Sequence, residues 1–131
     1  MNIFKKVIDG VQHKMETLQY RNKTLTLPLK DAIIMIRDLL GEESEPYQYI
    51  DRLYQVTKDD YHPVKIGFPQ VQVIDEGTHF VVSSTMTVDG FPLNLPMRVT
   101  KNREVANAIK WAIEDSFIAA FEKAENQRTL I

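Results

Sequence analysis

The dipeptide Asp89-Gly90 separates two runs of β-forming residues, and it constrains the fold more than any other feature of the chain. Asp-Gly favours a two-residue type I′ turn, in which both central residues have positive φ. Pairing outward from this turn matches Val88 with Phe91, Met86 with Leu93, Ser84 with Leu95, Val82 with Met97, and Phe80 with Val99. This register makes one face almost wholly apolar, and a shift of one residue would destroy it. The sequence therefore predicts a β-hairpin built from residues 78–88 and 91–99.

Two prolines, Pro92 and Pro96, lie in the second strand of this hairpin. In the predicted register, both fall at sites whose N–H group would point away from the first strand. Proline is tolerated within a sheet only at such edges. Residues 91–99 are therefore predicted to form an edge strand that no further strand can extend.

A long helix is predicted after the hairpin, with Asn102 as its N-cap. Its apolar stripe at helical spacing comprises Val105, Ile109, Ala112, Ile113, Phe117, Ala120, Phe121 and Ala124. We expect this stripe to cover the apolar face of the hairpin. Trp111 and Ile118 lie on the other side of the helix, and two interpretations stay open. They pack under another helix of the same chain, or they contact a subunit or partner.

The remaining patterns predict helices over residues 2–19, 31–40 and from 46 onward, and a short strand over 23–27. In the first helix, the face expected to pack on the domain carries Ile3, Phe4, Val7, Ile8, Val11, Met15 and Leu18. Residues 64–73 alternate as a strand that changes phase at Pro69, where we expect a bend. Matching apolar faces then pairs Val73 with Phe80 and Val71 with Val82.

These elements predict an α+β domain in the order α-β-α-α-β-β-β-α. We expect a three- to four-stranded antiparallel meander sheet with helices mainly on one face. Residues 1–131 are expected to form a single domain, mostly helical over 1–60, with the meander and the long C-terminal helix over 64–125. The other sheet face would then be open to solvent.

Composition excludes several classes of protein. The chain has no cysteine, so disulfide scaffolds, thiolate metal sites and cysteine nucleophiles are excluded. No apolar run approaches the roughly 20 residues that cross a bilayer, and the amphipathic N-terminus does not resemble a signal peptide. We therefore expect a cytoplasmic protein that does not bind membranes. The net charge of −2 argues against non-specific binding to polyanions.

Residues that commonly carry catalysis are scattered along the chain. His13, His62 and His79 fall in three different elements, and no metal-binding or nucleotide-binding motif is present. Glu114 and Asp115 are neighbours on a helix and are expected to diverge. We therefore predict that the protein is not an enzyme and needs no cofactor.

Two hypotheses for function remain. The first is a non-catalytic protein-interaction module, such as a small inhibitor, adaptor or assembly subunit of phage or mobile-element type, which binds a protein partner or itself as a homo-oligomer. Its expected interface residues are Trp111, Ile118, Tyr47, Tyr49 and Tyr54. Aromatic side chains are enriched at such interfaces.

The alternative is a protein that binds single-stranded nucleic acid or a nucleotide through the open sheet face and a basic corner. The expected ligand-binding or anion-binding residues are Asn94, Arg98, Lys101, Arg103, Lys110, Ser83 and Thr85. The meander and long helix over residues 64–124 are similar in shape to the core of phage single-strand-annealing proteins. This resemblance, which is one of shape, implies binding of single-stranded DNA.

Overall fold

The computed structural model describes residues 11–13, 15 and 17–129. The described residues before position 21 are helical and are called the first helix here. The elements that follow are β1 (Thr24–Pro28), α2 (Leu29–Leu40), α3 (Glu45–Thr57), β2 (Pro63–Gly67), β3 (Gln70–Asp75), β4 (Phe80–Val88), β5 (Phe91–Asn94), β6 (Arg98–Thr100) and α4 (Arg103–Thr129). The predicted N-terminal part of the first helix, residues 2–10, lies outside the described residues.

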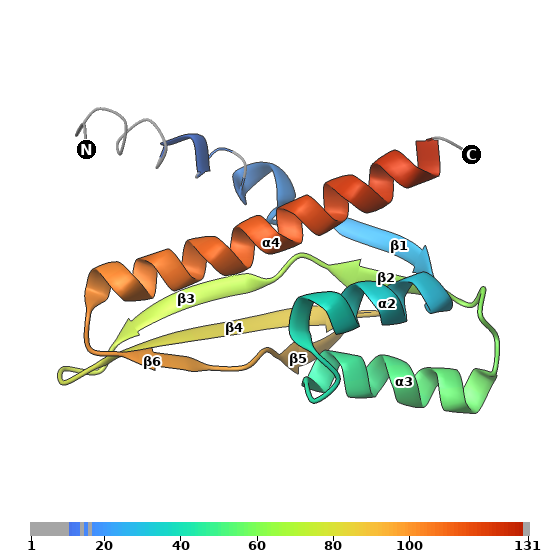
Figure 1. The fold of residues 1–131 in the computed structure, drawn as a ribbon, viewed down its shortest axis with the longest axis horizontal. Coiled ribbons are helices and arrows are strands. Elements are labelled where there is room, and N and C mark those ends of the chain that lie inside the picture. The colour runs from blue at the N-terminus through green and yellow to red at the C-terminus, as the bar shows by residue number, and fades with distance from the viewer. Residues whose placement is uncertain (1–10, 14, 16, 130–131) are drawn as a thin grey trace.

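The sheet contains six antiparallel strands in the described part of the chain, more than the three or four predicted (Figure 1). The α+β class is confirmed. β4 is central, as predicted: β2 and β3 follow one another along one side of it, and β5 and β6 along the other. β1 pairs with β2 and completes the sheet. The strand count rises because Pro69 and Pro96 each interrupt a strand that the alternation pattern treats as continuous.

The hairpin turn has the predicted geometry, with φ of 52° at Asp89 and 80° at Gly90. The predicted pairing of Val88 with Phe91 and of Met86 with Leu93 is confirmed. Beyond Leu95, whose N–H donates to the carbonyl of Ser84, the predicted register is wrong. Three further pairs define the observed register of β6: Phe80 with Thr100, Val81 with Val99, and Val82 with Arg98.

The register changes because the segment 95–97 contains one residue more than the facing part of β4. Such a bulge shifts each later side chain to the opposite face of the sheet. Val99 therefore leaves the helix-covered face and is exposed, and Met97 is exposed as well. Arg98, which was predicted on the open face, now shares the helix-covered face with Val82.

A second correction concerns the turn between β3 and β4. Val73 was predicted to pair with Phe80, but it pairs with Val82, and Phe80 pairs with Asp75. The segment that connects Val73 to its partner is therefore two residues longer than predicted. The N–H of Glu76 donates to the carbonyl of His79 across this turn. Because the offset is an even number of residues, every side chain stays on its predicted face.

Side chains of helices α2, α3 and α4 form one hydrophobic core together with the inward side chains of the sheet. The helical contribution to the core centres on Leu29, Ile36, Ile50, Phe117 and Phe121. Phe68, at the bend between β2 and β3, packs edge-on against Phe117 and Phe121. The other face of the sheet carries no described helix, as predicted.

Local signals set the ends of the helices. Gly41 ends α2 with φ of 85°, and its N–H donates to the carbonyl of Arg37. The Ser44 hydroxyl caps α3 by accepting the N–H of Tyr47. The Asn102 side chain caps α4 by accepting the N–H of Glu104 at 2.8 Å, as predicted.

The buried stripe of α4 differs from the predicted one. Val105 and Ala112 are exposed, whereas Ala106, Glu114 and Ile118 are buried. The difference arises because α4 is covered on two flanks, by the sheet on one and by the first helix on the other. A single apolar stripe read from the sequence cannot show the second flank.

Candidate functional site

The first helix packs on α4 through a polar contact. His13 is buried, and its Nε2 lies 3.1 Å from Oε1 of Glu114. Its Nδ1 lies 2.9 Å from Oδ1 of Asp115. The imidazole ring also stacks on Trp111, with 5.0 Å between ring centroids. Both neighbouring carboxylates thus reach one ring, and the prediction that Glu114 and Asp115 diverge is wrong.

Two further contacts extend this attachment along α4. The Tyr20 hydroxyl donates to Oε1 of Glu122 at 3.3 Å, and its ring packs edge-on against Phe121. Nζ of Lys23 lies 2.6 Å from Oε1 of Glu125. The first helix is therefore fixed at both ends of its described part.

The apolar face of the first helix points away from the domain. Val11, Met15 and Leu18 are 55%, 61% and 55% exposed, and they are called the outer stripe here. They were predicted to pack on the domain, and this prediction is wrong for the described residues. The spacing of the outer stripe recurs two positions further along the chain, in His13, Thr17 and Tyr20. A step of two residues is about 200° around the helix. The residues that dock on α4 and the outer stripe therefore occupy opposite faces of the first helix. The repeat at His13, Thr17 and Tyr20 is visible in the sequence and indicates the docking face.

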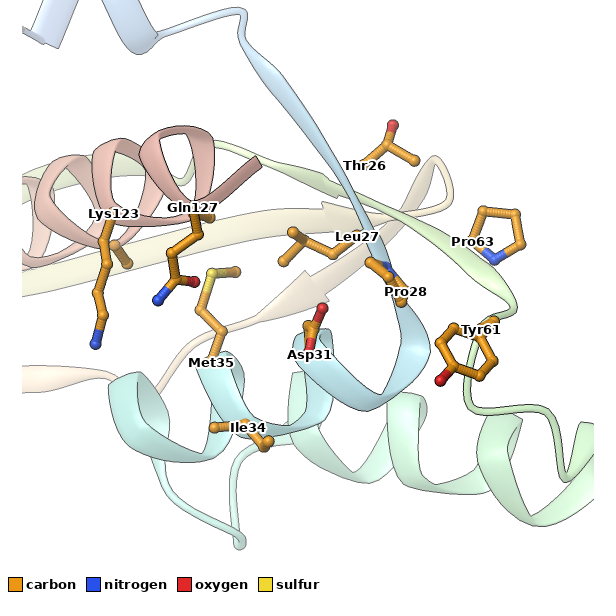
Figure 2. A pocket seen from close by; sticks show the side chains of 12 residues that line it. Thr26, Leu27, Pro28, Asp31, Ile34, Met35, Tyr61, Pro63, Lys123 and Gln127 are labelled. Atoms are coloured by element: carbon orange, nitrogen blue, oxygen red, sulfur yellow. The ribbon is translucent and has the colours of Figure 1, made fainter. Parts of the chain in front are cut away.

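A groove of about 690 Å³ lies between α2 and the C-terminal half of α4, beside β1. Figure 2 shows Leu27 and Met35 pointing into this space, with Lys123 and Gln127 descending from α4. Asp31 lies on the α2 side. The volume of the groove falls within the range of small-molecule sites. The apolar floor and charged walls can accept an apolar group flanked by polar ones.

The four basic residues predicted to form one corner have different surroundings in the structure. Nη2 of Arg103 lies 3.1 Å from Oδ2 of Asp75, and its guanidinium lies over the Phe80 ring at 5.2 Å. Arg98 lies on the helix-covered face, and Lys110 lies on the flank of α4 near the first helix, beside Glu114. Lys101 is exposed just before α4.

The polar residues predicted for the same ligand lie on the open sheet face. Thr85 pairs with Asn94, and Ser83 pairs with Gln72. They are thus separated from Arg98 by the thickness of the sheet. Binding of nucleic acid across the open face stays a prediction. The guanidinium of Arg98 does not lie on that face.

The predicted interface residues divide into two groups. Ile118 is buried within this chain, while Trp111 remains 42% exposed beside His13. Tyr47, Tyr49 and Tyr54 pack partly against the core, and Tyr49 stacks on Phe91 with ring centroids 5.4 Å apart. The contact between Trp111 and His13 agrees with the interpretation that another helix of the same chain covers this flank.

Neither a metal-ligand cluster nor a membrane-spanning helix is found among the described residues. Among residues 11–13, 15 and 17–129, no three His, Asp or Glu side chains are grouped as metal ligands. The helices in this part of the chain are too short or too polar to cross a membrane. Comparison with protein-family models, curated proteins and solved structures finds no match.

Proposed function

We propose that this protein is a non-catalytic interaction module that associates with a second copy of itself through the outer stripe. The observation that carries the proposal is the orientation of the first helix. It docks through His13 and Tyr20 and leaves three large apolar side chains in solvent. Exposed apolar patches of this kind are typical of protein interfaces.

The spacing of the stripe favours a helix as the partner. Val11, Met15 and Leu18 follow one another at intervals of four and three, which is the pattern of a coiled-coil seam. In the sequence, Phe4 and Ile8 continue the same intervals, although they lie outside the described residues. A second copy carries the complementary seam by symmetry.

Met15 is the centre of the proposed contact. In an antiparallel pair whose two-fold axis passes beside Met15, Met15 lies next to Met15, and Val11 of one copy lies within one residue of the level of Leu18 of the other. In a parallel pair, every stripe residue faces its own counterpart. We place the two-fold axis at Met15 because it is the middle residue of the stripe, so that Met15 lies near Met15 of the second copy in either orientation and the interface is isologous.

The energy available sets the expected strength. Full burial of a large apolar side chain contributes about 1.5–3 kcal/mol, so removing the exposed half contributes roughly 0.8–1.5 kcal/mol. Six described side chains in a dimer then contribute about 5–9 kcal/mol in total. Association costs about 4–15 kcal/mol. The most favourable balance is about 5 kcal/mol, so we expect a concentration-dependent dimer with a dissociation constant of about 0.2 mM or weaker.

Sedimentation velocity from about 10 µM to 2 mM tests the proposal, because this range extends about tenfold on either side of a dissociation constant of about 0.2 mM. Wild type should change from monomer to dimer as concentration rises. Met15→Glu should stay monomeric, because dimerisation would bury a carboxylate opposite its own copy. Gln72→Glu is the control: it adds the same charge at an exposed position of the open sheet face, away from the outer stripe. A wild-type monomer throughout, or a Met15→Glu dimer, would disprove the proposal.

A further inference from the structure

A second cavity lies where the bulge of the edge strand faces α4. It has a volume of about 360 Å³. Its walls come from the end of α2, the segment 95–98 and the middle of α4, and are formed by Leu39, Leu40, Leu95, Pro96, Arg98, Ile109, Ala112, Ile113, Ser116 and Phe117. The volume is at the lower end of the range for small-molecule sites. It is separate from the outer stripe and shares no residue with it.

Arg98 is the only charged residue in this lining. The bulge at 95–97 places it there, because the uninterrupted register would have put it on the open face. Within the described residues, no carboxylate lies within ion-pair distance of Arg98. Arg103, only five residues later, has such a partner in Asp75.

The other polar side chain in the lining is already engaged. The Ser116 hydroxyl donates to the carbonyl of Ile113 at 2.8 Å. The cavity therefore offers aliphatic and aromatic walls with one guanidinium that has no acidic partner. Guanidinium groups favour carboxylates because two parallel N–H groups match the two oxygens.

We infer that this cavity, called the Arg98 pocket here, binds a small carboxylate with a short apolar chain. The chain would occupy the space between Leu40, Ile113 and Phe117, and the carboxylate would pair with Arg98. Neither part of the ligand suffices alone: the pocket is small, and Arg98 is exposed to competing water and salt. This inference does not depend on self-association through the outer stripe.

Titration calorimetry with three probes tests the inference. Octanoate carries both features, octanol lacks the charge, and acetate lacks the chain. Octanoate should bind at least about tenfold more tightly than either, which is the effect of one charge-assisted pair. Equal affinity for octanoate and octanol, or no binding of octanoate in the millimolar range, would overturn the inference.

Variants locate the binding. Arg98→Gln should reduce octanoate affinity about tenfold, to the level of octanol. Ala112→Phe fills the pocket from an exposed helix position and should abolish binding while circular dichroism stays unchanged. Arg103→Gln is the matched control and should leave octanoate binding unaltered. Octanoate binding that survives both Arg98→Gln and Ala112→Phe would place the site elsewhere and refute the assignment.

Discussion

Replacing His13 by alanine removes the polar contact that orients the first helix. Glu114 is buried and loses its imidazole partner. A hydrogen bond to a charged group contributes about 1.5–3 kcal/mol, and the stacked contact with Trp111 about 0.5–1.5 kcal/mol. Asp115 is largely exposed, so its pairing with His13 adds little. The total is about 2–4.5 kcal/mol.

This total is an upper limit for the loss of global stability. If the first helix detaches, Glu114 returns to water and part of the cost is relieved. His13→Ala should therefore lower the free energy of unfolding by no more than this amount in a urea titration. It should also shift local structure toward a detached first helix.

Trp111 reports on detachment directly, because it is the single tryptophan of the chain and it stacks on His13. In His13→Ala, its fluorescence emission should move to longer wavelength under native conditions. Gln19→Ala, on an exposed face of the same helix, should change neither emission nor stability. A double-mutant cycle with Glu114→Ala should give a coupling energy above about 0.5 kcal/mol. Unchanged emission and stability in His13→Ala would refute the described attachment.

Three further substitutions test the packing. A Cβ on Gly67 would collide with the Thr87 hydroxyl. Gly67→Ala should therefore lower the free energy of unfolding in urea by about 1–2 kcal/mol, and adding Thr87→Ala should restore most of this loss. The buried Ser84 hydroxyl has no partner among the described residues, so Ser84→Ala should raise the melting temperature, with about 1 kcal/mol gained; a loss would indicate an unseen partner. Burial, and then the charge of Glu122, raises the pKa of Tyr20, so its stabilising contribution is complete below pH about 10 and is lost above it. Tyr20→Phe should weaken the decline in stability between pH about 9 and 11, and an unchanged alkaline decline would contradict this assignment.

Much of the fold was predictable because short-range patterns determine it. The Asp89-Gly90 turn, the bend at Pro69 and the Asn102 cap depend on a few neighbouring residues. The bulge at 95–97 was not predictable from alternation, because both registers bury several apolar residues and differ by one position. That single residue moved Arg98 to the other face of the sheet, away from Ser83, Thr85 and Asn94.

The attachment of the first helix was missed for a different reason. Its largest apolar stripe suggested the buried face. His13 gave no sign of a partner in the sequence, and the side chains of Glu114 and Asp115 were expected to diverge. The attachment depends on residues about 100 positions apart, so no local pattern shows it. The only signal was the repeat of His13, Thr17 and Tyr20 at helical spacing.

Disulfide cross-linking at Met15 tests self-association most directly. The chain has no native cysteine, so Met15→Cys introduces the only thiol. In the proposed dimer, which is centred on Met15, this position lies near its own copy, and mild oxidation at about 200 µM protein should give a covalent dimer within minutes. Gln72→Cys, exposed on the open sheet face, should remain monomeric under the same conditions. A Met15→Cys protein that cross-links no faster than Gln72→Cys would contradict association through the outer stripe.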